Sequence, residues 1–448
     1  MKKLLYVALL AVGVFILMTP PAMAQEEKPF TLHGEIRFRG EYQANANDLN
    51  KDTNDNADFW PYRVRIAAEG RFSHNIGAWI EFQSAGNAGG TLTPVRLGNA
   101  DVFAGEGVEM YQGNITFNQL WSKNFSLRVG RQEIVAGNEL MLGDLDFYSG
   151  LSHDGFVANW NLKKVNLMLW ATRPAQVGVN SLTSNFTSPD NTFIGGVGGT
   201  QNFWGGYATW TFMKDQTFDV YAMDLDTKVA ANVQTIGVRY AHDVPGKTGF
   251  FWDAELAKQF GKAAYGTPDV KANGNADEGW FGYNWRSGKN NHRFYGRIEQ
   301  ASGDKTTTAD KNEGFVPMFG DFHNRTGHGD WFVLANDPSN LGGGGINGGT
   351  TGSGLKAWSV AYTGYFTDKN EFGVAYWKYK LDQKNVATGH TDLGNSTDIW
   401  YGYNYSKNTT FTVSLSQLKP GDALKDISAG GLHDDTVTRL YGQARLRF

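Results

Sequence analysis

Residues 32–42, LHGEIRFRGEY, alternate between apolar or small side chains and polar or charged ones. The even positions hold Leu32, Gly34, Ile36, Phe38, Gly40 and Tyr42, and the odd positions hold His33, Glu35, Arg37, Arg39 and Glu41. An α-helix would repeat its apolar residues at spacings of three and four, so a period of two predicts a β-strand with one apolar and one charged face. Residues 62–71 repeat the pattern, with arginine or glutamate at most odd positions.

Similar alternation recurs along the chain and gives about 18 candidate strands in total. The further segments are 76–83, 108–117, 125–132, 154–160, 165–171, 203–210, 218–223, 235–241, 250–260, 279–285, 293–300, 355–363, 372–379, 399–405, 411–418 and 438–448. The composition agrees, because 56 glycines and many aromatic residues with only 12 prolines favour strands joined by turns. The predicted class is therefore all-β.

The composition also excludes several kinds of chemistry. With no cysteine, the chain can form no disulfide, no Cys-ligated metal centre and no cysteine nucleophile. The 41 basic and 45 acidic side chains give no basic excess, so no nucleic-acid partner is expected.

The first 24 residues have the pattern of a secretory signal peptide. Lys2 and Lys3 precede an apolar run from Leu4 to Met18, and the small residues of Ala22-Met23-Ala24 suit cleavage before Gln25. A membrane anchor is the competing interpretation, but the run is short for a bilayer span. The mature protein is then 25–448. It has no apolar stretch long enough for a transmembrane helix, whereas membrane-spanning β-strands remain compatible with the sequence.

The last segment indicates where such a sheet would be located. Leu440, Gly442, Ala444, Leu446 and the terminal Phe448 alternate with polar residues. A terminal aromatic residue on an amphipathic strand resembles the assembly signal of bacterial outer-membrane barrels, and a soluble β-sandwich is the alternative. We therefore predict a transmembrane antiparallel up-and-down β-barrel of about 18 strands, surrounded by outer-membrane lipid.

The charged rows must face the inside of such a barrel, because charge on the lipid-facing side costs a few kcal/mol at mid-depth. Tryptophan and tyrosine near the strand ends, such as Trp60, Trp170 and Trp400, are expected to form aromatic girdles. A barrel of 16 to 18 strands is wide enough to leave an aqueous channel. The pattern therefore predicts a conduit.

Three irregular segments are expected to form loops. Residues 44–58 are rich in Asn and Asp and are predicted to be a solvated extracellular loop, with calcium binding left open. Residues 178–199 and 301–354 are longer, and the second is long enough to form an external lid or a plug in the pore. His323 and His328 match no metal signature, so no metal site and no cofactor are predicted.

Several stretches resemble the alginate export family of outer-membrane barrels. They are Gly130-Arg131-Gln132 followed by His153-Asp154-Gly155-Phe156, then 235–240, 254–261, and the run from Phe315 to Asp330. They occur in the family's order, although His153 stands where the family usually has Phe. The resemblance implies an 18-stranded barrel that passively exports a polyuronate through a constriction lined by basic side chains.

The candidate pore-lining or substrate-binding residues are the charged side chains of the predicted inward rows. They are Arg37, Arg39, Arg63, Arg65, Arg128, Arg131, Asp154, Arg239, Glu255, Arg293, Arg297, Arg439 and Arg445. The resemblance gives most weight to Arg65, Arg131, Arg239 and Arg297. Arginine forks suit carboxylates, yet the same side chains could instead pair with Glu35, Glu69, Asp154, Glu255 or Glu299 in a lattice that stiffens the barrel.

The predicted function is a passive outer-membrane channel for hydrophilic solutes, with a preference for anionic sugar acids. The alternatives are a general porin and a plugged barrel that holds a partner protein. An outer-membrane hydrolase is disfavoured, because neither Gly-x-Ser-x-Gly nor His-Glu-x-x-His occurs. A closed barrel has no free edge that demands a partner, so a monomer is expected.

Overall fold

The computed structural model describes residues 30–46, 48–54, 56–88, 107–174, 201–227, 231–264, 268–305, 307–316, 318–321, 325–332, 352–385, 388–427 and 433–448. The predicted signal peptide and the predicted loop at 178–199 lie outside these ranges, as do His323 and the glycine-rich part of the 301–354 segment. No helix in the described ranges is long and apolar enough to cross a membrane.

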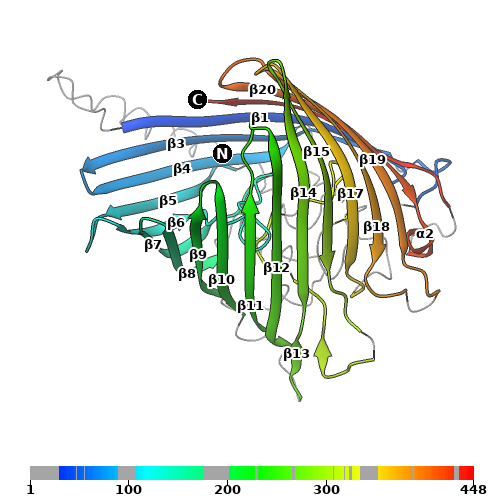
Figure 1. The fold of residues 1–448 in the computed structure, drawn as a ribbon, viewed down its shortest axis with the longest axis horizontal. Helices are drawn as coiled ribbons and strands as arrows, with labels where there is room; N and C mark the ends of the chain where they lie inside the picture. The colour runs from blue at the N-terminus through cyan, green and yellow to red at the C-terminus, as the bar shows by residue number, and fades with distance from the viewer. Residues whose placement is uncertain are drawn as a thin grey trace.

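Within the described ranges, eighteen long antiparallel strands form one closed sheet, which confirms the predicted fold (Figure 1). They are β1 (Phe30–Ala44), β3 (Pro61–Ser73), β4 (Ile76–Asn87), β5 (Glu109–Asn118), β6 (Phe125–Gln132), β7 (His153–Asn161), β8 (Val165–Pro174), β9 (Asn202–Met213), β10 (Gln216–Asp226), β11 (Asn232–His242), β12 (Gly249–Ala264), β14 (Asn275–Ser287), β15 (Asn290–Ala301), β17 (Leu355–Phe366), β18 (Asn370–Leu381), β19 (Asp392–Asn404), β20 (Thr409–Pro420) and β21 (Val437–Arg447). Three short strands, β2 (Ala57–Phe59), β13 (Val270–Ala272) and β16 (Lys311–Asn312), and the helix α2 (Asp422–Ile427) lie in the connections.

The barrel closes where the first strand meets the last. β1 pairs with β21 from Glu35 opposite Arg447 to Ala44 opposite Thr438. Gly34 and Phe448 extend this seam, because each donates its backbone N–H to the other's carbonyl oxygen, at 2.8 and 3.0 Å. A Cβ at Gly34 would lie only 2.3 Å from the Phe448 ring. Glycine at position 34 therefore makes room for the terminal aromatic residue.

The two ends of the barrel differ in the length of their connections. Short turns join the strands at the end where the chain terminates, at 74–75, 162–164, 214–215, 288–289 and 367–369. At the opposite end, consecutive strands are separated by longer stretches of sequence, at 45–60, 88–108, 133–152, 302–354 and 421–436. We call these the short-turn end and the long-loop end.

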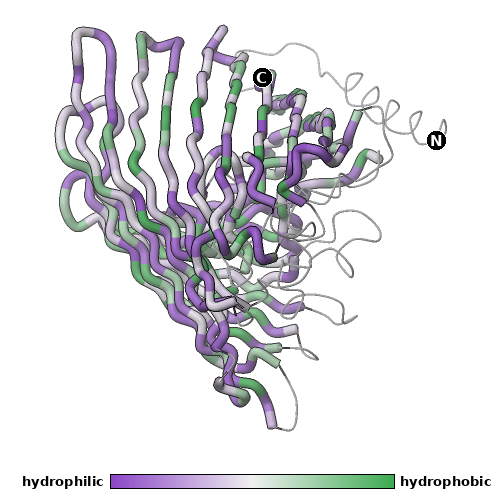
Figure 2. Tube along the Cα trace, turned by 90° about the vertical axis from the view of Figure 1, so that its right-hand side faces the viewer, coloured by the Kyte–Doolittle hydropathy of each residue, from purple (hydrophilic) through white to green (hydrophobic). Residues whose placement is uncertain are grey.

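The two faces of the strands follow the predicted alternation. Ile36 and Phe38 are exposed on the outside of β1, whereas Arg37 and Arg39 between them are buried on the inside. The same alternation of apolar and polar residues runs along the neighbouring strands (Figure 2). Trp170 and Trp400 depart from the predicted girdle, because their strands place them in the inward register, where both are buried on the lumen side.

The buried apolar core lies inside the barrel, around two connections that fold into the lumen. One is residues 133–152, which we call the inward loop, and it contributes buried residues such as Leu142 and Leu145. The other is the part of 313–332 that the structure describes, the inward strap, with Phe319 and Trp331 fully buried. Leu142 and Phe319 form a parallel bridge, so the loop and the strap are joined by backbone pairing. The inward loop and the inward strap therefore fill part of the lumen that would otherwise hold water.

Candidate functional site

One sector of the lumen is lined by guanidinium groups on adjacent strands. Arginines in the inward register of β1, β3 and β21 form it, and we call it the basic wall: Arg37, Arg39, Arg63, Arg65, Arg439 and Arg445. The alternation that makes each strand amphipathic also stacks these side chains, because β1 lies between β3 and β21. All six are sequence-predicted site residues, and the fold brings them together.

The basic wall holds the inward loop. Arg37 donates hydrogen bonds from Nη1 to the carbonyl oxygen of Asp146 at 2.7 Å and from Nη2 to that of Tyr148 at 2.5 Å. Arg65 Nη2 donates to the carbonyl oxygen of Ser149 at 2.6 Å. Backbone carbonyls that a buried loop would otherwise leave unpaired are therefore satisfied by arginine side chains.

Asp146 is the carboxylate at the centre of this contact. It forms an ion pair with Arg63 and lies 3.2 Å from Arg65 and 3.1 Å from Arg445. Burial alone would raise its pKa, but the guanidinium groups of Arg63 and Arg65 outweigh burial and lower the pKa of Asp146 to about 2. The loop therefore carries a fixed negative charge into the basic wall.

Aromatic rings and the inward strap complete the wall. The Arg39 guanidinium lies 3.8 Å from the centre of the Phe147 ring, and that of Arg65 lies 3.9 Å from the Tyr111 ring. Arg439 binds Glu41 at 2.8 Å and also donates to the carbonyl oxygen of Gly329 in the strap at 3.0 Å. Both inward segments are thus anchored to the same strands.

An acidic sector lies halfway round the barrel, on β10 to β15. Its lumen-facing carboxylates are Asp219, Asp253, Glu255, Glu278 and Glu299. Arg239 bridges Asp219 and Asp253 with Nη1 and Nε at 2.8 Å from their oxygens, and Arg297 pairs with Glu299. Predicted residues Arg239, Glu255 and Arg297 are therefore in the lumen, within a mixed-charge network rather than in the basic wall.

The remaining inward candidate on this side is Arg293. It pairs with Asp243 at 2.7 Å near the short-turn end and lies 4.0 Å from the centre of the Phe251 ring. Sequence reasoning missed Arg325 of the strap, which joins the network by an ion pair with Glu278 and a 2.8 Å hydrogen bond to the carbonyl oxygen of Asn138. Its role depends on how the strap folds.

Three carboxylates meet where the loop and the strap pair. The side-chain oxygens of Glu139, Asp144 and Asp321 lie within 4.8 Å of one another, close enough for a cation to bridge them. Burial, with repulsion from Asp144 and Asp321, raises the pKa of Glu139 to about 7. Gly143 N–H donates to the carbonyl oxygen of Phe319 at 2.7 Å, so backbone pairing holds these acids together.

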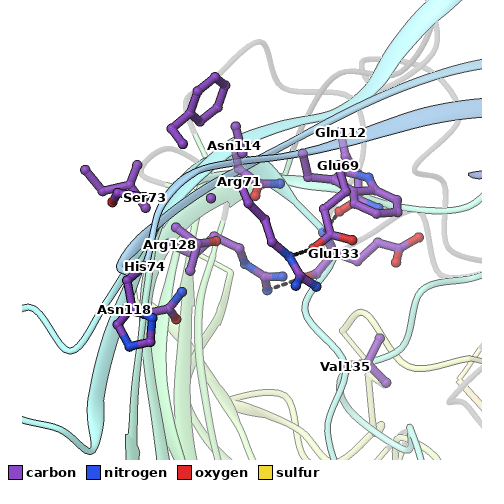
Figure 3. A pocket seen from close by; sticks show the side chains of 16 residues that line it. Glu69, Arg71, Ser73, His74, Gln112, Asn114, Asn118, Arg128, Glu133 and Val135 are labelled. Carbon is purple, nitrogen blue, oxygen red and sulfur yellow. Dashed lines mark hydrogen bonds and ion pairs between the residues drawn. The ribbon is translucent and has the colours of Figure 1, made fainter. Parts of the chain in front are cut away.

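A cavity of about 1120 Å³ lies in the lumen between the start of the inward loop and the short-turn end, and Figure 3 shows side chains that line it. Arg128 enters it from β6, and Arg71 enters it from β3. The polar side chains of Gln112, Asn114, Thr116 and Asn118 come from the inward register of β5. Of these residues, only Arg128 was among the predicted site residues, although amides at alternate positions of β5 indicate a polar lumen wall.

Two predicted site residues lie elsewhere. Arg131 and Asp154 pair by two parallel hydrogen bonds of 2.8 and 2.9 Å on the outer register of β6 and β7. Arg131 alternates with Arg128 and Gln132, which face inward, and Asp154 shares its face with the exposed Phe156. The prediction that they line the pore is therefore wrong: a mutually neutralised pair is accommodated outside, near the long-loop ends of the strands.

Two other predictions concern metal ions. His328 is buried against Trp400, with ring centres 4.4 Å apart, and burial lowers its pKa to about 4. In the 44–58 loop, Asp48 accepts hydrogen bonds from the Asn50 N–H at 3.0 Å and the Thr53 hydroxyl at 2.6 Å. His328 is therefore packed in the buried interior, and each Asp48 oxygen accepts one hydrogen bond.

Comparison with known proteins adds independent evidence. Residues 28–340 match the family described as Alginate export. No curated protein matches.

Solved structures of outer-membrane porins share the fold. The chain is similar to OccK2 (OpdF) of Pseudomonas aeruginosa, at 15% identity and a TM-score of 0.58, covering 94% of this chain and 98% of that one. It is also similar to OprD of the same organism, at 12% identity and a TM-score of 0.59, covering 94% of both chains. A further structure of OccK2, in complex with glucuronate, matches at 14% identity with a TM-score of 0.57, over 94% of this chain and 98% of that one.

At these identities the likeness shows the fold, which the chain shares with outer-membrane porins of solved structure. The family match covers well over half of the sequence, and the barrel has the lumen, the closure and the loop asymmetry of a porin. The chain therefore belongs to the alginate export family of outer-membrane β-barrel porins.

Proposed function

We propose that the channel is passive and prefers anionic solutes of the sugar-acid or polyuronate type. The observation that supports this preference is the composition of the basic wall. Glu35 is shared by Arg63, Arg445 and Arg447, and Asp146 is shared by Arg63, Arg65 and Arg445. Arg37 adds a further guanidinium that binds only backbone carbonyls. Around Glu35 and Asp146 the guanidinium groups therefore outnumber the carboxylates, while Glu41, Asp330, Glu81 and Glu133 pair with other arginines of the wall or with the far side of Arg65. This local excess of positive charge attracts anions, and the low dielectric constant of the barrel wall strengthens the attraction.

The arginines also define where the passage is narrow. They bind the inward loop, so the loop stands against the basic wall and a solute must pass beside it. Arginine side chains offer several donors in a fixed plane, which suits exchange of a carboxylate from one guanidinium to the next. The same groups thus support the loop and set the potential along the passage.

The measurement that tests this is the reversal potential of the refolded protein in a planar bilayer under a KCl gradient. The proposal expects anion selectivity, together with faster entry of glucuronate than of glucosamine into protein-containing liposomes. Cation selectivity, or equal entry of the two solutes, would leave a general porin.

A plugged barrel is the second candidate, favoured by the buried loop and strap inside the lumen. A plugged barrel would insert without conducting. Shortening the 301–354 segment would then raise the conductance, whereas in an open channel it would change only gating noise.

We further propose that residues 1–24 are a cleaved signal peptide and that the barrel is monomeric in the outer-membrane lipid. The closed β1–β21 seam supports the second point, since it leaves no strand edge to pair with another copy. Mass spectrometry of the purified protein and its mass in detergent would test both.

A further inference from the structure

The cavity at the short-turn end has features of a binding site in addition to those of a passage. It lies below the inward loop, and in outer-membrane barrels the short turns face the periplasm. Its wall combines two arginines, Arg71 and Arg128 (Figure 3), with a row of amide and hydroxyl side chains on β5 and one tryptophan from β4. Its volume of about 1120 Å³ exceeds that of a typical small-molecule pocket, so it has room for a sugar together with water.

Arg128 is the distinctive cation of this cavity. Its Nε donates to the Gln132 side-chain oxygen at 2.5 Å and its Nη2 to the carbonyl oxygen of Glu133 at 2.9 Å. No carboxylate of the described residues forms an ion pair with it, in contrast to Arg63, Arg65 and Arg239. A guanidinium has five N–H donors. Arg128 is thus a half-buried, oriented cation with donor capacity left for an anion.

Arg71 offers a second, more mobile cation on the neighbouring wall. Its Nε contacts Glu69 at 3.2 Å, and its side chain is 63% exposed. A pair of this exposure contributes little binding energy, so a ligand carboxylate can compete for Arg71.

The acids of the cavity offset these cations only in part. Glu69 is divided between Arg71 and His33, the latter at 3.5 Å. Glu133 accepts a 2.5 Å hydrogen bond from the Tyr111 hydroxyl, and burial raises the pKa of Glu133 to about 7. Near neutral pH this carboxyl is therefore only partly charged.

Trp79 supplies the apolar element. It faces the lumen from β4 and lines the cavity. The His33 ring stacks on it with ring centres 5.1 Å apart, and its Nε1 donates to Glu81 at 3.1 Å. The indole is therefore fixed on one face and at its polar edge, while it still contributes to the cavity wall. A fixed aromatic ring suits the C–H face of a pyranose.

We propose that this cavity is a binding subsite for a single sugar acid, with Arg128 and Arg71 on the carboxylate, the β5 amides on the hydroxyls and Trp79 against the ring. A small inorganic anion would leave the tryptophan and amides unused, and a neutral sugar would leave Arg128 unpaired. The inference rests on the proposed function only in that an anionic sugar must reach the lumen.

The test is calorimetric titration of the refolded protein in detergent with glucuronate, glucose and acetate. We expect glucuronate to bind more tightly than either of the others. Arg128→Gln and Trp79→Leu should each weaken glucuronate binding at least about tenfold. Arg128→Lys keeps the positive charge but loses the planar set of donors, so its affinity for glucuronate should lie between those of the unmodified protein and Arg128→Gln. Arg286→Gln, an exposed arginine across the barrel on β14, is the matched control and should bind as the unmodified protein does.

Each variant must keep the heat-modifiable electrophoretic mobility of a folded barrel before it is compared. No binding of glucuronate, acetate binding as tightly as glucuronate, or equal affinities in Arg128→Gln and Arg286→Gln would overturn the proposal. The reversal potential separates the two hypotheses. If the channel is anion-selective but binds no glucuronate, the proposed function stands and the subsite proposal fails. If the channel is cation-selective but binds glucuronate, the subsite stands and the proposed selectivity fails.

Discussion

Arg37 donates a 2.7 Å hydrogen bond to the backbone carbonyl of Asp146, although the two residues are 109 positions apart in the sequence. This contact joins the seam strand β1 to the inward loop. It means that an arginine predicted to line the pore also fixes the segment that narrows it. Selectivity and loop position are therefore coupled through the same side chains.

Asp146→Asn should release part of the inward loop. The change leaves Arg63, Arg65 and Arg445 without their shared carboxylate, and loss of one partner from a buried ion cluster costs about 3 kcal/mol. We expect a lower urea midpoint in detergent, noisier single-channel current and stronger anion selectivity. Asp154→Asn, which removes a carboxylate from the exposed outer pair, is the control. Equal unfolding midpoints for the two variants would contradict the anchoring role.

The same carboxylate predicts an acid limit. Its folded pKa of about 2 lies below the usual value, so its stabilising contribution is complete above about pH 4 and is lost as the pH falls through 2. Channel noise should therefore rise between pH 4 and pH 2 in the unmodified protein. Asp146→Asn should show the noisy current at both pH values.

Gly130→Ala should destabilise the barrel beside the proposed subsite. Gly130 has φ of 124°, and an added Cβ would lie 2.3 Å from the Gly113 carbonyl oxygen, which is backbone and cannot rotate away. A strained conformation of this kind costs about 1–3 kcal/mol. Gly442→Ala is the matched control, because its Cβ would meet only Val413 at 3.8 Å. Urea unfolding of the two variants should separate them by that amount.

Arg131→Gln should leave ion selectivity unchanged, even though the sequence placed Arg131 in the pore. Its side chain pairs with Asp154 on the outer face, where an exposed ion pair contributes about 0–1 kcal/mol. Arg65→Gln, in the basic wall, should shift the reversal potential towards cation selectivity. A shift of the same size in Arg131→Gln would mean that Arg131 lines the pore after all.

The sequence predicted the barrel because each strand repeats the same two-residue period, which depends only on local pattern. Assigning a single residue to a face is harder. In the segment 125–131, Arg131 follows the apolar residues Phe125, Leu127 and Val129 at alternate positions, so the pattern places it on the outer face. The prediction was wrong because it assumed that every arginine faces inward. The inward loop was beyond prediction, because its course is set by arginines that come from β1, β3 and β21, far away in the chain.

Glu139→Gln should remove a pH dependence from the contact between the inward loop and the strap. Burial and the neighbouring Asp144 and Asp321 raise the pKa of Glu139 to about 7, and Arg325 only partly offsets them. Between its unfolded pKa of about 4.3 and pH 7, the folded protein holds a proton that the unfolded chain has lost, so the free energy of unfolding falls as the pH rises through this window. The urea midpoint should therefore decline from pH 5 to pH 8 in the unmodified protein and decline less in Glu139→Gln. Glu109→Gln on β5, away from the triad, should keep the full decline. A decline that persists unchanged in Glu139→Gln would mean that another carboxyl group causes it. Glu133, whose pKa is also raised to about 7, would be the next residue to substitute.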